Sequence, residues 1–193
     1  MVEKYKIGFT RPALLLETVV VAQLYANSGD WQRVEAEILT ANPFQTRTQR
    51  SSAIIYGEIQ KRLSLLNPEQ IQVMANNSPQ DVRQLVWICI CKQYPFVADF
   101  VSEVAVPLYL SGRADISYDD YGYFFNKKAD WHPELESVSD KTRSNARQAL
   151  FQMMRQCELL SDANQFIPQM VSSAVQNCSS EADLAYIPGA IRL

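Results

Sequence analysis

Hydrophobic residues along this chain recur at helical spacing. Ile55, Ile59 and Leu63 follow one another every four residues, which places them on one face of a helix. Residues 82–90 are apolar nearly all round, a pattern that indicates a helix buried in the core. Strict alternation of apolar and polar residues is rare. The pattern therefore predicts an all-α, compact multi-helix globular protein.

Turn and capping residues divide this pattern into separate helices. Ser28-Gly29 ends the first helix, and Asp30 is placed to cap the second. Ser78-Pro79-Gln80-Asp81 combines an N-cap, a proline at the first helical position and an acid in the first turn. We expect helices over residues 12–27, 31–41, from Thr46 or Thr48 to about 66, 68–75, 79–93, from 95 to a kink or end at Pro107, 118–129, one short turn over 134–138, and 139–160.

The chain changes character after residue 160. Turn residues at 161–165 precede a short apolar stretch, an order found in winged helix-turn-helix modules, and the sequence leaves open whether a small β-wing follows the 139–160 helix. The turn at 111–115 is the best lobe boundary. We expect an N-terminal helical lobe at 1–110 with a helix-turn-helix-like segment at 30–66, and a C-terminal lobe at 111–193 with a second one at 117–171.

Length and composition allow a substantial core. The chain has 193 residues and is 47% hydrophobic, which is enough for one compact domain or two small lobes. The apolar run 14–26 contains Glu17 and Gln23 and is shorter than the about 20 residues of a membrane span, so we expect a buried helix and no membrane association. A net charge of -3 excludes a protein that is basic throughout. Nucleic-acid binding would have to rest on local patches.

The spacing of the cysteines and of the single histidine does not match a metal-binding motif. Cys89, Cys91, Cys157 and Cys178 contain no C-x-x-C pair, and His132 stands alone. The first three cysteines lie in apolar helical patterns, which indicates core thiols in a reducing cytoplasm. We expect no disulfide framework, no metal and no cofactor.

Motifs for catalysis are missing as well. The sequence has no P-loop, dinucleotide fingerprint, nucleophile elbow or zinc-protease motif. His132 precedes a proline in a polar turn, so it is more easily explained as a turn residue than as a general base. The acids at 119–120 and lysines at 127–128 resemble a nuclease set, but they fall in a helical pattern and not on adjacent strands. We therefore expect that the protein is not an enzyme.

The 139–160 helix carries Lys141, Arg143, Arg147 and Arg155 with no acid between them. Its cations lie on or beyond the flank of an apolar stripe, whereas a face that serves only solubility usually pairs Glu with Lys one turn apart, at about 0.2–0.5 kcal/mol per pair. The first turn offers hydroxyl groups and free backbone N–H groups to a phosphate, in the manner of a recognition helix. A simply solvated basic face is the competing interpretation.

A second basic stretch at 46–63 faces only Glu58, and Lys127-Lys128 could extend the positive surface. The candidate DNA-binding residues are Arg47, Arg50, Lys61, Arg62, Lys127, Lys128, Lys141, Arg143, Arg147 and Arg155. Segment 97–120 instead carries five acids against Arg113 alone. In the alternative hypothesis, this acidic segment and exposed aromatics around Tyr121 and Tyr123 dock another protein subunit.

Short patterns along nearly the whole chain carry a family resemblance. They are Lys4-Tyr5 with Phe9-Thr10, Leu14-Leu15-Leu16-Glu17-Thr18, Asp30-Trp31, Tyr94-Pro95-Phe96 with Asp99-Phe100, Asp120-Tyr121 with Phe124-Phe125, and the 139–160 helix. With these patterns the chain resembles the BrxA family, small core proteins of the bacteriophage exclusion (BREX) defence systems. The resemblance implies an all-helical fold with helix-turn-helix elements and double-stranded DNA binding without known catalysis. It also implies work beside a methyltransferase and a large ATPase. We expect a cytoplasmic monomer.

Overall fold

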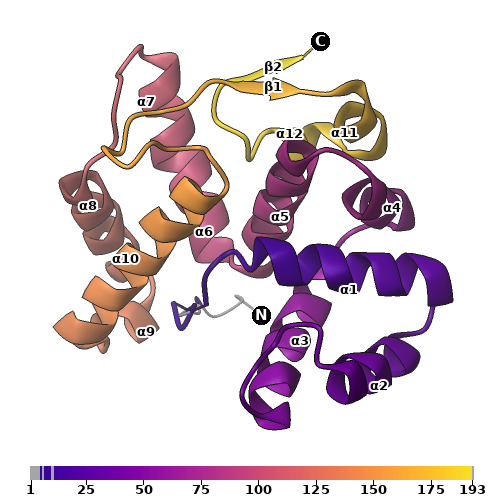
Figure 1. Cartoon of the computed structure of the whole chain (residues 1–193). Helices are drawn as coiled ribbons and strands as arrows, with labels where there is room; N and C mark the ends of the chain where they lie inside the picture. Colours follow the sequence, from indigo (N-terminus) through magenta and orange to yellow (C-terminus); the bar gives the residue numbers. More distant parts are fainter. Residues whose placement is uncertain (1–4, 6, 10, 193) are drawn as a thin grey trace.

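Helices dominate the computed structural model, which describes residues 5, 7–9 and 11–192 (Figure 1). In chain order they are α1 (Leu15–Ser28), α2 (Trp31–Ala41), α3 (Gln49–Leu63), α4 (Pro68–Asn76), α5 (Pro79–Gln93), α6 (Pro95–Phe100), the π-helical turn η1 (Val101–Ala105), α7 (Val106–Leu110), α8 (Tyr118–Ala129), α9 (Pro133–Glu136), α10 (Asp140–Gln156), α11 (Ser173–Cys178) and α12 (Glu181–Leu184). Two short strands, β1 (Gln169–Val171) and β2 (Ala190–Arg192), accompany them. The expected helical class is confirmed.

The expected capping residues begin several of these helices. The side chains of Asp30, Thr48 and Ser139 each accept a hydrogen bond from a backbone N–H in the first turn of α2, α3 and α10. Ser78 and Asp81 form a reciprocal capping box at the start of α5. Because these bonds satisfy donors that have no partner within the helix, local sequence sets the helix starts.

The helix that begins at Pro95 does not end at Pro107. It runs on to Leu110, and its irregularity is the π-helical turn η1 directly before the proline. There the N–H of Val106 donates to the carbonyl of Val101, five residues earlier. Pro107, which has no N–H to donate, thus falls in the first turn after the π turn, where the α-helical ladder restarts.

Helix α5 lies at the centre of the core, as its apolar sequence predicts. Six consecutive residues in it are fully buried: Leu85, Val86, Trp87, Ile88, Cys89 and Ile90. The aromatic stripe of α8 packs on α6, with the rings of Phe96 and Phe124 5.1 Å apart. On α10 the apolar stripe, including Leu150 and Met154, is buried as expected. These contacts leave the polar flanks of α8 and α10 on the outside.

The segment after α10 forms a small antiparallel hairpin, and Asp115 pairs with its second arm through an isolated bridge to Gln165. Leu160 and Phe166 make an isolated antiparallel bridge that closes a tight turn, in which Ser161 N–H donates to the Gln165 carbonyl at 2.8 Å. Strand β1 then pairs in parallel with β2, so its neighbour is the C-terminal end of the chain. The hairpin at 159–167 lies where a β-wing was expected, and whether it acts as a wing stays a prediction.

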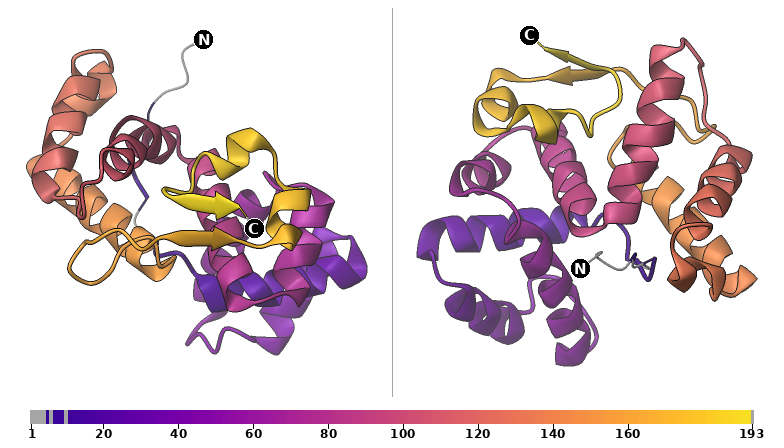
Figure 2. Two further views of the ribbon diagram at one scale, coloured as in Figure 1. Left: turned by 90° about the horizontal axis from the view of Figure 1, so that it is seen from above. Right: turned by 180° about the vertical axis from the view of Figure 1, so that it is seen from behind.

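The C-terminal segment returns to the first half of the chain. Helix α11 packs on α4 and α5, and Trp87 donates from its indole N–H to the Tyr186 carbonyl at 2.7 Å. Figures 1 and 2 show this segment beside α4 and α5. The division into lobes at 111–115 stays a prediction, although residues 173–187 contact helices on the other side of that boundary.

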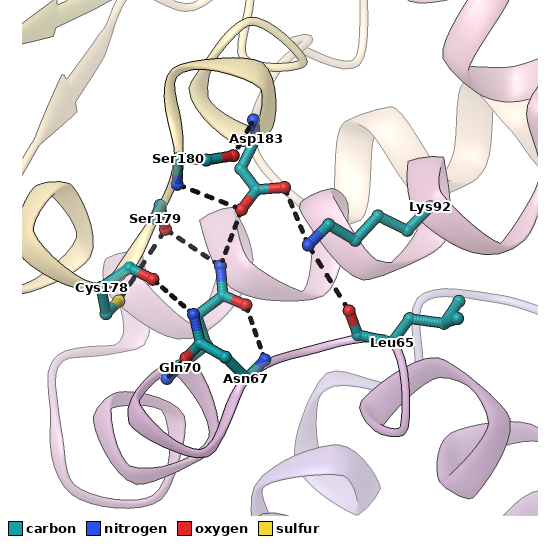
Figure 3. A network of polar contacts seen from close by, with 8 residues as sticks. All are labelled: Leu65, Asn67, Gln70, Lys92, Cys178, Ser179, Ser180 and Asp183. Atoms are coloured by element: carbon teal, nitrogen blue, oxygen red, sulfur yellow. Dashed lines mark hydrogen bonds and ion pairs between the residues drawn. The ribbon is translucent and has the colours of Figure 1, made fainter.

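A polar network fastens this C-terminal segment (Figure 3). The Asp183 carboxylate receives the Lys92 ammonium at 2.8 Å and the Gln70 amide N–H at 3.2 Å. The Ser180 backbone N–H also donates to it, at 3.2 Å. Burial acts to raise the pKa of Asp183, but the hydrogen bonds from Lys92 and Ser180 outweigh it and hold that pKa below its usual value.

The structure bears on two expectations from the sequence, one about the cysteines and one about membrane-spanning helices. All four cysteines are free and buried, and burial raises the pKa of Cys89 to about 12. Within the described ranges, no single helix has the length and apolar character to cross a membrane. The α5 helix and the helix Pro95–Leu110 reach that length and composition only as a pair, bent by 112°.

Candidate nucleic-acid interface

Two arginines of α10 are held by aromatic rings of α8. The Arg143 guanidinium lies 4.3 Å from the centre of the Phe125 ring, and the Arg147 guanidinium lies 4.5 Å from that of Tyr118. Arg143 also donates to the Gly122 carbonyl at 3.1 Å. In the part of the chain that the structure describes, neither arginine forms an ion pair with a carboxylate. Their charge is therefore oriented without being neutralised.

The other cations of α10 differ in their surroundings. Lys141, in the first turn, is exposed and has no ion pair within the described ranges. Arg155, at the far end of the helix, is half-buried and donates to the Asn164 side chain at 2.8 Å. The structure thus groups Lys141 with Arg143 and Arg147 and separates Arg155 from them.

The start of α3 presents a smaller basic surface. Arg47 and Arg50 flank the Thr48 cap, are exposed, and form no ion pair within residues 5, 7–9 and 11–192. Lys61 is also exposed but lies about 16 Å further along the helix axis, given the rise of about 1.5 Å per residue. Only the first two therefore share one end of the helix.

Arg62 is not part of an interface, and its assignment to DNA binding is wrong. Its side chain is 0% exposed and pairs with Glu58 at 3.1 Å. It also donates to the carbonyls of Pro12 and Ala13 at 3.1 and 3.0 Å. Arg62 thus anchors the segment before α1 to α3, and burial excludes it from contact with a duplex.

Lys128 also serves the fold and is withdrawn as a DNA-binding residue. Its side chain is 13% exposed, and its ammonium lies 2.6 Å from both Asp99 and Glu103. Burial acts to lower the pKa of Lys128, but these carboxylates outweigh it and hold that pKa above its usual value. Lys127 is exposed, yet it lies 3.4 Å from Glu103, which screens its charge.

Most of the acidic segment 97–120 is likewise neutralised inside the molecule. Arg113 makes two bonds to the Asp120 carboxylate, at 2.9 and 3.0 Å, and approaches Asp115 at 3.5 Å. With Asp99 and Glu103 engaged by lysines, Asp119 is the acid of this segment left exposed without an ion pair among the described residues.

The aromatic residues of α8 do not all lie where the adaptor hypothesis places them. Tyr121 is buried, so it offers no docking surface and that expectation is wrong. Tyr123 is 77% exposed, as expected. The role of Tyr118 and Phe125 as supports for arginines was not predicted. Its only sequence signal is an aromatic stripe next to a basic helix, and that pattern also fits core packing.

The basic ends of α3 and α10 lie apart but on the same side of the molecule. In Figure 1 both helices begin at the lower side, α3 below the centre and α10 at the left, with α8 and α9 beside it. Helix α2 packs on α3 across the loop 42–48. Whether the segments at 30–66 and 117–171 act as helix-turn-helix elements stays a prediction.

Comparison with known proteins finds relatives by sequence and a solved structure with the same fold. The BrxA family model matches residues 3–183. The BREX protein BrxA of Escherichia coli O9:H4 (strain HS) is 25% identical over 131 residues, 68% of this chain, and the match spans 62% of that protein. The BREX protein BrxA of Bacillus cereus (strain H3081.97) is 22% identical over 145 residues, which is 75% of this chain and 72% of that protein. The crystal structure of an uncharacterized protein from Magnetospirillum magneticum covers 96% of both chains with a TM-score of 0.78 at 18% identity, and so shares the fold.

Proposed function

The chain belongs to the BrxA family of BREX phage-defence proteins, and from this premise we propose that it is a cytoplasmic, non-catalytic accessory protein that binds double-stranded DNA. The observation that carries the proposal is the pair Arg143 and Arg147, held on aromatic rings with no carboxylate partner in the described chain. Lys141 extends this surface, and Arg47 and Arg50 form a second one on the same side. The other BREX components, a methyltransferase and a large ATPase, are proposed partners.

Phosphates are the groups that we expect these residues to contact. Arginine forms bidentate hydrogen bonds to phosphate, and stacking fixes the plane of each guanidinium before DNA arrives. A pre-oriented side chain loses less conformational freedom on binding. Because phosphates carry no sequence information, we expect little sequence preference from the protein alone.

A gel-shift series across salt tests the proposal. If about four phosphates are engaged, the log–log slope of affinity against salt is about -3.6, and affinity falls about a hundredfold between 50 and 200 mM. Absence of binding at low salt, or a signal that does not change with salt, contradicts the proposal.

Charge-matched variants locate the interface. The double variant Arg143→Gln/Arg147→Gln should make the log–log slope of affinity against salt less steep by about 1.8, since each lost phosphate contact contributes about 0.9. Lys61→Gln/Lys127→Gln removes the same charge from the C-terminal ends of α3 and α8 and should change the slope little. Equal losses in both variants would mean that only the total charge matters.

The adaptor function remains the second candidate because Tyr123 and Trp131 are 77% and 80% exposed. Large exposed aromatic side chains are enriched at protein interfaces. Co-purification with another BREX component that survives nuclease treatment and is lost in Tyr123→Ser/Trp131→Ser would favour this function. The same variant should bind DNA normally under the first proposal.

A further inference from the structure

A hollow opens between α8 and α10 beside the two stacked arginines. Its volume is about 310 Å³. Both arginines line it from α10, and Tyr118, Tyr121 and Gly122 line it from α8. Asp119, Asp140 and Ser144 complete the lining. The volume is at the lower end of the range of small-molecule sites.

Two buried polar atoms of this lining have no hydrogen-bond partner among the described residues. They are the hydroxyl of Tyr121, a residue only 1% exposed, and Nε of Arg147. Nearly all buried polar groups in folded proteins are paired, so each unpaired one calls for an explanation. An occupant of the hollow that offers acceptor atoms would satisfy both.

Both unpaired groups act as donors. The Nε–H of an arginine can only donate. Burial raises the pKa of Tyr121, although Arg143 and Arg147 act in the opposite direction, so the hydroxyl keeps its proton at neutral pH. The lining thus sets two guanidinium groups and a buried hydroxyl donor beside two aspartates, and a group that carries both acceptor oxygens and hydrogen-bond donors complements it.

We propose that this hollow binds a single phosphoryl group, carried on a nucleotide or on a DNA strand. Arg143 and Arg147 supply the positive charge, and Tyr121 and the Arg147 Nε–H supply donors. Asp119 and Asp140 oppose a bare anion but can accept from hydroxyl or amino groups, which favours a nucleotide phosphate over inorganic phosphate. The DNA-strand source rests on the proposed function, whereas the nucleotide source does not.

Thymidine 5′-monophosphate is the probe, with thymidine as the control that lacks the phosphoryl group. Isothermal titration at constant ionic strength should show binding of the monophosphate and not of thymidine, and weaker binding of inorganic phosphate. Tyr121→Phe keeps the ring and removes only the hydroxyl, so affinity should fall roughly ten- to hundredfold, as expected for a lost hydrogen bond to a charged group. Arg147→Lys keeps the charge but loses Nε, and a similar loss should follow.

Stability and a neighbouring variant serve as controls. Because the Tyr121 hydroxyl has no partner among the described residues, Tyr121→Phe without ligand should melt at or above the wild-type temperature. A role in folding alone would lower it. Lys127→Gln removes a charge from α8 but does not line the hollow, so it should bind the monophosphate like the wild type.

The two sources are separated by competition with a labelled duplex. Displacement of the duplex by the monophosphate assigns the hollow to a strand phosphate, and binding of both together assigns it to a free nucleotide. The inference is overturned if thymidine binds as well as its monophosphate, or if Tyr121→Phe binds the monophosphate unchanged. Duplex binding without monophosphate binding overturns only this inference, and monophosphate binding without duplex binding overturns only the proposed function.

Discussion

Replacing Asp183 should loosen the C-terminal segment by a predictable amount. The carboxylate is 8% exposed and accepts bonds from Lys92, Gln70 and the Ser180 N–H. In Asp183→Ala the Lys92 ammonium keeps only the Leu65 carbonyl at 3.4 Å. Breaking a buried ion pair costs about 3–5 kcal/mol. Since Lys92 is 27% exposed and water can reach it, we expect the lower end, about 3 kcal/mol. For a chain of this size that is a fall in Tm of about 6–12 °C.

The stabilisation should also depend on pH. The pKa of Asp183 is lower in the folded protein than in the unfolded chain, because Lys92 and Ser180 stabilise the charged form more than burial disfavours it. A depressed folded pKa contributes stability above the unfolded value, about 3.9, and that contribution is lost as pH falls through the folded value. The wild type should therefore exceed Asp183→Asn in stability by a constant margin from pH 7 to about 5. The margin should shrink below about pH 4.

Urea unfolding of wild type, Lys92→Met, Asp183→Asn and the double variant gives the measurement. The double-mutant cycle should show a coupling free energy of about 1 kcal/mol or more between the two residues. Hydrogen exchange should locate the loss of protection at α11 and α12. A coupling free energy near zero, together with a margin that stays the same from pH 7 to pH 3, would refute the account of this network.

Three further predictions concern single positions. Arg62→Met should lower the free energy of unfolding by about 3–5 kcal/mol, as for a broken buried ion pair. The folded fraction of this variant should show the wild-type dependence of DNA affinity on salt in gel shifts. Gly189→Ala should lower the free energy of unfolding in urea by about 1–3 kcal/mol, because Gly189 has a left-handed φ of 69° and an added Cβ would meet the Tyr109 ring. Gly29 has a similar φ of 64° but no such neighbour, so Gly29→Ala should lower that free energy by less. The buried thiols, whose pKa values burial raises, should react slowly with Ellman's reagent at pH 8 in the native state and fully in urea, and fast native labelling of Cys89 or Cys157 would contradict the core assignment.

The sequence predicts those parts of the fold that local signals determine. The cap at Asp30 and the capping box at Ser78 begin helices at the expected residues, because a cap and its partners lie within one turn. The π turn before Pro107 has no comparable signature. The pairing of β1 with β2 could not be predicted, because Ala190 lies 21 residues beyond its partner Gln169 and nothing near β1 specifies that pairing.

The candidate site was predictable only as a list of charges. Arg62 follows Ile59 by three residues and Ile55 by seven, so it lies on the apolar face of its helix, whereas Arg147 lies on the flank of the apolar stripe of α10. The partners of Arg62 at Pro12 and Ala13 are 50 and 49 residues away, and the distance from Lys128 to its partner Asp99 is 29 residues. Periodicity could therefore have marked Arg62 for burial, but contacts between such distant positions depend on how the helices pack, so local charge could not show which cations have partners inside the molecule.

What distinguishes the remaining arginines is the kind of group that holds them. A carboxylate fixes a cation and cancels its charge, as Asp120 does for Arg113. An aromatic ring fixes a guanidinium through its quadrupole, at about 0.5–1 kcal/mol on an exposed surface, and leaves the net charge intact. Arg143 and Arg147 are held in the second way, over Phe125 and Tyr118. In a chain with a net charge of -3, this arrangement orients two guanidinium groups without an ion pair among the described residues, which is what the proposed contact with phosphate requires.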